Sequence, residues 1–269
     1  MEINTIRFKN LAKEKIDAYL KTEVRNSLSF HERISFDSEG FLGMPYSLNA
    51  VGEGPESQYE NYPLYNFQET NCMAMIEHVL AIALSNSFEK FYENLIKIRY
   101  KNGEIDIRKR NHYVYADWLL NNTWLLADIT KDLLKDKANQ YTLKRTISHL
   151  SFFKNKGFDN LKDLEKDKTI TINYIPFTLI KEIRNQLRPG DILSLIIKNK
   201  PDLFVSHLML LIEKDGEKYI RESALSQKTT LDTKLHEWLF EKEKTDKFLG
   251  ITVIRPFNKP TSYQLPATS

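Results

Sequence analysis

Cysteine is nearly absent from this 269-residue chain: Cys72 is the only one, so no disulfide can form within the chain. Long apolar runs are absent too. A membrane-spanning helix needs a run of about 18 apolar residues, and none occurs. The amino terminus has neither the apolar segment nor the small-residue cleavage site of a signal peptide. The location is therefore open: periplasmic or exported if a signal has been trimmed, and otherwise cytoplasmic or secreted without a signal peptide.

An excess of one charge is also missing, because 39 basic and 36 acidic residues leave a formal charge of +3. Nucleic-acid-binding proteins concentrate positive charge on one face, so this balance argues against such a partner. Metal-ligand motifs such as CxxC and HExxH do not occur, and we expect neither a metal nor another cofactor. The GEGP loop at 52–55 lacks the lysine and the following helix of a phosphate-binding loop.

What is present is enough apolar material for a large core, since 41% of the residues are hydrophobic and 12% aromatic. Helical spacing of apolar residues predicts an amphipathic helix between Ile6 and Leu20. The glycine-containing segment 40–63 is predicted to be an ordered loop. Further helices are predicted at 72–83, at 88–100, from Ala116 within HYVYADWLL, and at LHEWLFEKE (235–243).

The last third of the chain favours strands. Alternation and β-branched residues predict them at TITINYIP (169–176), DILSLIIK (191–198), FVSHLMLLIE (204–213) and EKYIRES (217–223). Helices followed by an antiparallel sheet predict the α+β class. We expect one catalytic domain over 1–256, with a helical extension at 1–39 and a core at 40–256, followed by a loose tail at 257–269.

The single cysteine opens a predicted helix, with Thr70 or Asn71 before it as the N-cap. At a helix start, free backbone N–H groups and the helix dipole favour a thiolate over a thiol. A thiolate beside an imidazole attacks carbonyl carbon well, so Cys72 is the predicted nucleophile. The alternative interpretation is an inert cysteine on the buried face of the helix.

His207 differs from the other histidines because it interrupts an apolar strand, FVSHLMLLI. A polar side chain in a buried strand costs roughly a few kcal/mol unless it is hydrogen-bonded. We interpret His207 as a base that projects toward the helix start, and the alternative is a satisfied core histidine. Other histidines lie in helix-like or charged segments and have no partner suggested by spacing: His31, His78, His149 and His236.

An imidazole base needs an acceptor for its second ring nitrogen. If the strands at 204–213 and 217–223 pair through the KDGE turn at 214–217, Glu222 and Ser223 arrive beside His207. Glu222 can accept the imidazole N–H and is the predicted third member of the triad. The alternatives are that Glu222 is a solvated carboxylate at a strand end, or that Ser223 takes its place.

Several segments occur in an order that resembles a known family: GMPY (43–46), FQETNCMAMIEHVLAIA (67–83), IRYKNGEI (98–105), NHYVYADWLLNN (111–122), INYIP (172–176), RPGDILSLI (188–196), VSHLMLLI (205–212) and IRESA (220–224). The chain resembles the bacterial NlpC/P60-like family described as N-acetylmuramoyl-L-alanine amidase-like. The resemblance covers roughly residues 40 to 240. It departs at Asn71, where the family usually has aspartate, and at 222–224, where the family often has HAS.

The resemblance implies a papain-like NlpC/P60 core in which the catalytic helix packs on an antiparallel sheet. It agrees with the placement of Cys72 as nucleophile and His207 as base, while Glu222, where the family often has histidine, is assigned the third catalytic role from the strand pairing. It also implies substrate contacts near the nucleophile and along the HYxxxDW segment, for which we expect these residues: Tyr46, Asn71, His112, Tyr113, Asp117, Trp118, Ser206 and Ser223.

The leading functional hypothesis is a cysteine hydrolase that cleaves an amide bond in peptidoglycan, between lactyl and L-alanine or within the stem peptide. A second hypothesis is a cysteine peptidase or acyltransferase with a non-wall substrate on the same scaffold. A third is a binding module without catalysis, although such a module has no use for a Cys–His pair. The expected partner is a peptidoglycan fragment or a peptide, and the sequence makes no prediction of oligomeric state.

Overall fold

The computed structural model describes residues 6–257. Residues 258–269 of the predicted tail, and residues 1–5 of the predicted extension, lie outside this range. The first half of the chain is helical: α1 (Lys13–Leu20), α2 (Glu23–Asn26), α3 (Phe30–Ser38), α4 (Cys72–Ala83) and α5 (Phe88–Arg99). The helices predicted at 72–83 and 88–100 are therefore confirmed.

A six-stranded antiparallel sheet forms the second half, in the order β1-β8-β4-β5-β6-β7. Its strands are β1 (Leu126–Asp128), β4 (Ile192–Ile197), β5 (Val205–Lys214), β6 (Glu217–Ala224), β7 (Thr229–Lys234) and β8 (Phe248–Pro256). The predicted strands at 191–198, 204–213 and 217–223 are confirmed. Helices and an antiparallel sheet in one chain make the fold α+β.

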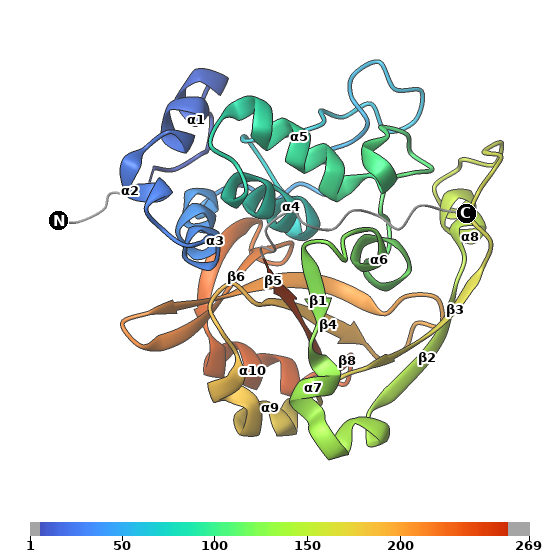
Figure 1. Ribbon diagram of the computed structural model, residues 1–269. Helices are drawn as coiled ribbons and strands as arrows, with labels where there is room; N and C mark the ends of the chain where they lie inside the picture. The colour runs from blue at the N-terminus through green and yellow to red at the C-terminus, as the bar shows by residue number, and fades with distance from the viewer. Residues whose placement is uncertain (1–5, 258–269) are drawn as a thin grey trace, which may run out of the picture.

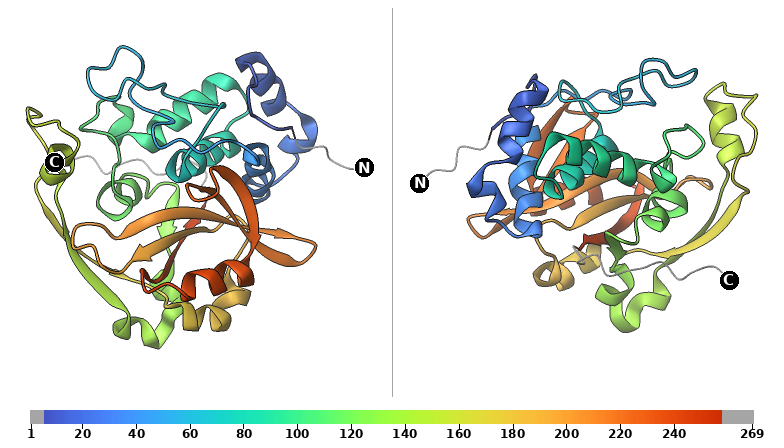
Figure 2. Two further views of the ribbon diagram at one scale, coloured as in Figure 1. Left: turned by 180° about the vertical axis from the view of Figure 1, so that it is seen from behind. Right: turned by 45° about the horizontal axis from the view of Figure 1, so that its top comes forward.

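Helices cover both faces of this sheet (Figure 1). The bundle of α1 to α5 lies on one face, while α9 (Phe177–Ile183) and α10 (Leu235–Glu243) lie on the other (Figures 1 and 2). Alternate residues of β5 serve the two sides: Leu208 and Leu210 join the apolar core beneath α4, and Met209 and Leu211 join the core that includes Trp238 of α10. Because successive side chains of β5 point to opposite faces, the sheet has a separate apolar core on each face.

The α4 helix is central, because every residue from Ala74 to Ala83 is buried. Burial extends to its polar side chains, and each finds a partner. Glu77 accepts a 2.6 Å hydrogen bond from the Nε of buried Arg99. His78 donates from Nδ1 to the Ala74 carbonyl and accepts from the Asn66 N–H. An apolar helix with its few polar groups satisfied is held rigidly against β5 and β6.

The predicted helix between Ile6 and Leu20 is partly wrong, because helix α1 begins only at Lys13. The preceding segment is not helical, and the Phe8 N–H donates to the Gly40 carbonyl at 2.8 Å. The fully buried Phe8 ring lies so close to Gly40 that a Cβ there would clash with it. Long-range contacts of one aromatic ring therefore outweigh the local helical pattern.

Two other predictions differ from the structure. The TITINYIP segment contributes β3 (Lys168–Asn173), which pairs with β2 (Thr142–Ile147) in a separate two-stranded ribbon outside the main sheet. In HYVYADWLL the helical conformation begins earlier than predicted, as a π-helical turn at Val114–Trp118 that continues into α6 (Leu119–Asn121). The remaining helices are α7 (Thr130–Leu134) and α8 (His149–Asn155).

Candidate active site

Cys72 is the first residue of α4, and its surroundings explain why the helix starts there. The Asn71 backbone is extended and its side-chain oxygen accepts a 2.9 Å hydrogen bond from the Ala74 N–H, which makes it the N-cap. The other end of the same amide donates to the Leu48 carbonyl at 3.2 Å. Both polar ends of Asn71 are thus used to fix the helix start. Of the two predicted caps, Asn71 and not Thr70 makes this bond.

His207 follows an irregularity in the sheet. Along β4, Leu195 pairs with His207 but the next residue, Ile196, pairs with Val205. Ser206 is therefore the extra residue of a β-bulge, and its hydroxyl donates to the Leu195 carbonyl at 3.2 Å. Bulges next to functional sites redirect side chains. Here the bulge comes immediately before the histidine and leaves Ser206 exposed.

Glu222 contacts this imidazole directly. The Nε2 atom of His207 lies 2.6 Å from Oε2 of Glu222. The main-chain ladder between β5 and β6 runs only from Lys214–Glu217 to Leu210–Arg221, so the side-chain contact lies just past its end. Because Nε2 is engaged by the carboxylate, Nδ1 is the ring nitrogen left to face Cys72.

The thiol of Cys72 is half-buried and lies close enough to the His207 ring for each group to shift the pKa of the other. Burial alone would raise the pKa of the thiol. The charge and hydrogen bond of His207, with the N–H groups of Leu208 and Met73, outweigh burial and bring the pKa below its ordinary value. The surroundings therefore favour a thiolate at this position.

The pKa values of His207 and Glu222 shift in the directions that an ion pair with the thiolate requires. Burial disfavours the imidazolium form of His207, but the Cys72 thiolate and the Glu222 carboxylate stabilise it, and its pKa rises. Burial would raise the pKa of Glu222, yet His207 lowers it on balance. A thiolate, an imidazolium and a carboxylate can therefore coexist in a line.

Tyr46 reaches the site through main-chain pairing. Its N–H donates to the Lys228 carbonyl at 3.0 Å, and it forms a parallel bridge with Thr70, two residues before Cys72. The Pro45 carbonyl accepts from the Thr70 N–H at 2.9 Å, which extends this pairing. Burial and the proximity of the Cys72 charge both raise the pKa of the Tyr46 phenol. The GMPY segment thus brings this phenol within electrostatic range of the thiol.

Most of the HYxxxDW side chains that were predicted to contact substrate make contacts within the protein instead. Trp118 has no exposed surface and lies in the core, so it cannot touch a solute, contrary to our expectation. The Asp117 carboxylate accepts the N–H groups of His112 and Tyr113 and lies 2.9 Å from the Nε2 of His149. These bonds hold the π-helical turn, because buried polar groups need partners.

Two further predicted side chains also turn inward. The His112 ring donates from Nε2 to the Ile107 carbonyl at 2.8 Å and packs on Phe152. Burial holds the pKa of His112 well below its ordinary value, so the ring is neutral. The buried hydroxyl of Ser223 donates to the Thr70 carbonyl at 3.4 Å. Glu222, and not Ser223, is the side chain in contact with His207.

The surroundings of Glu222 were not predicted from the sequence. Trp238 and Lys242, both on α10, lie beside its carboxylate and help to lower its pKa. Their spacing of four residues puts them on one helix face, which the sequence does reveal. Which strand that face meets depends on the pairing of β6 with β7, which was not among the predicted pairings.

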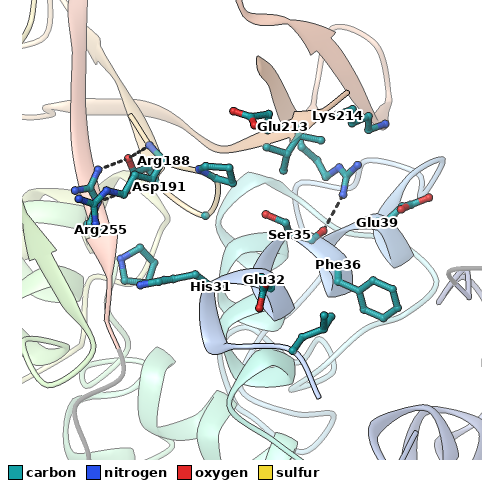
Figure 3. A pocket seen from close by; sticks show the side chains of 16 residues that line it. His31, Glu32, Ser35, Phe36, Glu39, Arg188, Asp191, Glu213, Lys214 and Arg255 are labelled. Carbon is teal, nitrogen blue, oxygen red and sulfur yellow. Dashed lines mark hydrogen bonds and ion pairs between the residues drawn. The ribbon is translucent and has the colours of Figure 1, made fainter. Parts of the chain in front are cut away.

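A separate cavity of about 650 Å³ lies between α3 and the start of β4 (Figure 3). Three of its cations are held by the protein's own carboxylates. Arg255 pairs with Asp191 at 2.7 Å, and Arg221 and Lys214 pair with Asp232 at 2.7 and 2.6 Å. Cations neutralised in this way do not point to a ligand, and Cys72, His207 and Glu222 do not line the cavity.

Within residues 6–257, no helix is both long and apolar enough to cross a membrane.

Comparisons with known proteins agree with the fold. A Legionella pneumophila protein of known crystal structure superposes with a TM-score of 0.80 at 25% identity, over 91% of this chain and 94% of that one. The crystal structure of an N-acetylmuramoyl-L-alanine amidase from Bacteroides uniformis gives a TM-score of 0.66 at 23% identity, over 85% of this chain and 99% of that one. No curated protein sequence gave a significant match. The family model described as N-acetylmuramoyl-L-alanine amidase-like matches residues 37–248, and the chain belongs to that family.

Proposed function

We propose that the chain is a cysteine hydrolase that cleaves an amide bond in peptidoglycan, with Cys72 as nucleophile, His207 as acid and base, and Glu222 as the group that orients the imidazole. The observation that carries the proposal is the line of contacts from Cys72 through His207 to Glu222. We further propose that this line is the papain-like arrangement of the NlpC/P60 group. The substrate class rests on the family and on the amidase among the structural neighbours.

In the first step, the thiolate sulfur of Cys72 attacks the amide carbonyl carbon, and the carbonyl electron pair moves to oxygen. The Met75 and Ala74 N–H groups are already bonded to Asn71, while the Met73 N–H faces the sulfur. The Cys72 N–H at the helix start is therefore the backbone donor proposed for the oxyanion. The Tyr46 hydroxyl, whose pKa responds to the Cys72 charge, is proposed as a second donor.

In the second step, the imidazolium of His207 gives its Nδ1 proton to the leaving nitrogen as the carbon–nitrogen bond breaks. A thioester on Cys72 and a free amine result. Neutral His207 then takes a proton from water, the hydroxyl adds to the thioester carbon, and the carbon–sulfur bond breaks to release a carboxylic acid. Glu222 holds Nε2–H in both steps, and so keeps Nδ1 available for proton transfer.

Mass analysis of purified muropeptides after incubation with the protein tests the proposal. Cleavage between lactyl and L-alanine yields a glycan with a free lactyl carboxylate and a peptide with a free L-alanine amino group. Shortened stem peptides would instead identify an endopeptidase. Unchanged muropeptides, with a protein that still alkylates at Cys72, would favour a peptidase or acyltransferase with a non-wall substrate.

A peptidoglycan substrate also implies that the protein reaches the cell envelope in its host, which we propose as its location. Fractionation with an antibody against the chain checks this. Protein found only in the cytosol would count against the wall substrate while leaving the cysteine chemistry intact.

A further inference from the structure

The α10 helix packs on the sheet face opposite α4, against β6 and β7 (Figure 1). Its Trp238 is 2% exposed and belongs to the apolar cluster that includes Met209 and Ile220. Residues two apart in a strand share a face, so Met209 shares its face with His207 and Ile220 shares its face with Glu222. Trp238 therefore lies on the side to which the histidine and the glutamate point.

The indole N–H of Trp238 is buried, and among residues 6–257 nothing accepts a regular hydrogen bond from it. Buried donors are nearly always paired, so an unpaired one calls for a reason. The nearby acceptor is the Glu222 carboxylate, whose Oε2 atom is engaged by His207. Burial raises the pKa of this carboxyl, and the indole of Trp238 lies close enough to act with His207 in lowering it.

Lys242 supports the same arrangement. Its Nζ lies 5.4 Å from the centre of the Trp238 ring, and a cation over an indole face is attracted to it. The ammonium also helps to lower the pKa of Glu222. One face of α10 thus presents a rigid N–H donor and a positive charge to a single carboxylate.

We propose that Trp238 is a positioning residue: its indole N–H holds the Glu222 carboxylate in the orientation from which Oε2 accepts the Nε2 proton of His207. This inference rests on the proposed triad. The α10 helix contributes no side chain to the Cys72–His207–Glu222 triad, but it orients the imidazole through Glu222. Hydrogen bonds of this kind are often imperfect without substrate and tighten in the reacting complex.

The test is a double-mutant cycle read by the rate at which iodoacetamide alkylates Cys72 in the full chain near pH 6, a measurement that needs no substrate. Trp238→Phe removes the N–H and keeps an aromatic ring. We expect alkylation to slow by about tenfold, the size of one hydrogen bond to a charged group. In a Glu222→Ala background, Trp238→Phe should have no further effect, because residues that act through one contact are not additive.

Trp124→Phe is the matched control. Trp124 is half-buried beneath Lys97 of α5, away from α10, and its replacement should leave alkylation unchanged in both backgrounds. To remove the N–H without changing shape, Trp238 can be replaced by benzothienylalanine, which should slow alkylation as the phenylalanine does. This variant keeps the test valid if Trp238→Phe fails to fold.

The proposal would be overturned if Trp238→Phe slowed alkylation equally in the presence and absence of Glu222. It would also be overturned if benzothienylalanine did not slow alkylation. With an active substrate, the same variants should lower kcat and leave KM unchanged. Absence of muropeptide cleavage would refute the proposed function but leave the alkylation result unaffected, so the two failures can be told apart.

Discussion

His207 and Glu222 are joined by their side chains where the main-chain pairing of their strands has ended: Nε2 and Oε2 are 2.6 Å apart, past the last ladder pair, Leu210–Arg221. The bulge at Ser206 immediately precedes the histidine. The regular part of the sheet therefore supplies a rigid frame, and the irregular end carries the side chains that face Cys72.

Glu222 should affect the rate through the orientation of His207. Loss of the aspartate in serine-protease triads costs roughly 10⁴ in kcat, and the helix dipole at Cys72 should reduce the loss here to about 10² to 10³. Glu222→Gln keeps an acceptor oxygen and should lose less than Glu222→Ala. The measurement is kcat on muropeptides, and full rates in both variants would exclude Glu222 from the mechanism.

The same variants should move the pH profile in a defined direction. The carboxylate stabilises the imidazolium and raises the pKa of His207, so activity in the wild type should fall only above the ordinary imidazole value of about 6.5. Without the carboxylate, the basic limb should shift to lower pH. A basic limb at the same pH in Glu222→Ala would show that the carboxylate does not set this pKa.

His207 should control the reactivity of the thiol. Its charge and hydrogen bond keep the pKa of Cys72 low, so iodoacetamide should label the wild type well below pH 8. His207→Ala removes both effects and should move the alkylation profile to higher pH, toward an ordinary thiol. His236→Ala, an exposed histidine on α10, is the control. Overlapping profiles for His207→Ala and the wild type would argue against the ion pair.

Tyr46→Phe tests the proposed second oxyanion donor. Removing one such donor in hydrolases typically costs about 10² to 10³ in kcat, while substrate binding changes little. The phenylalanine ring keeps the packing beside Cys72, so alkylation of the thiol should remain fast. An unchanged kcat would place the second donor elsewhere.

A buried ion pair in the helical extension should matter for stability. The Asp37 carboxylate accepts from Tyr19 at 2.6 Å and from the Nε of Arg25 at 2.8 Å, and all three side chains are buried. Asp37→Ala leaves a buried guanidinium without its partner, which typically costs about 3–5 kcal/mol. Urea denaturation measures the loss. Lys21→Ala, which removes an exposed pair, should leave stability nearly unchanged.

Local patterns were sufficient to predict the helix that begins at Cys72 and the strand that carries His207. Each depends on side-chain spacing within about ten residues. The burial of Trp118 could not be predicted in this way, because it depends on which side of the π-helical turn meets the core. The approach of Trp238 to Glu222 likewise requires that α10 pack onto β6, an arrangement set by segments distant in the sequence.

Cys72 is the residue that we propose performs the hydrolysis. The most direct measurement is the release of peptide and glycan products from purified muropeptides by the wild type and by Cys72→Ala, with circular dichroism to verify that the variant is folded. We expect cleavage by the wild type and none by the folded variant. Undiminished cleavage by Cys72→Ala would exclude Cys72 as the nucleophile.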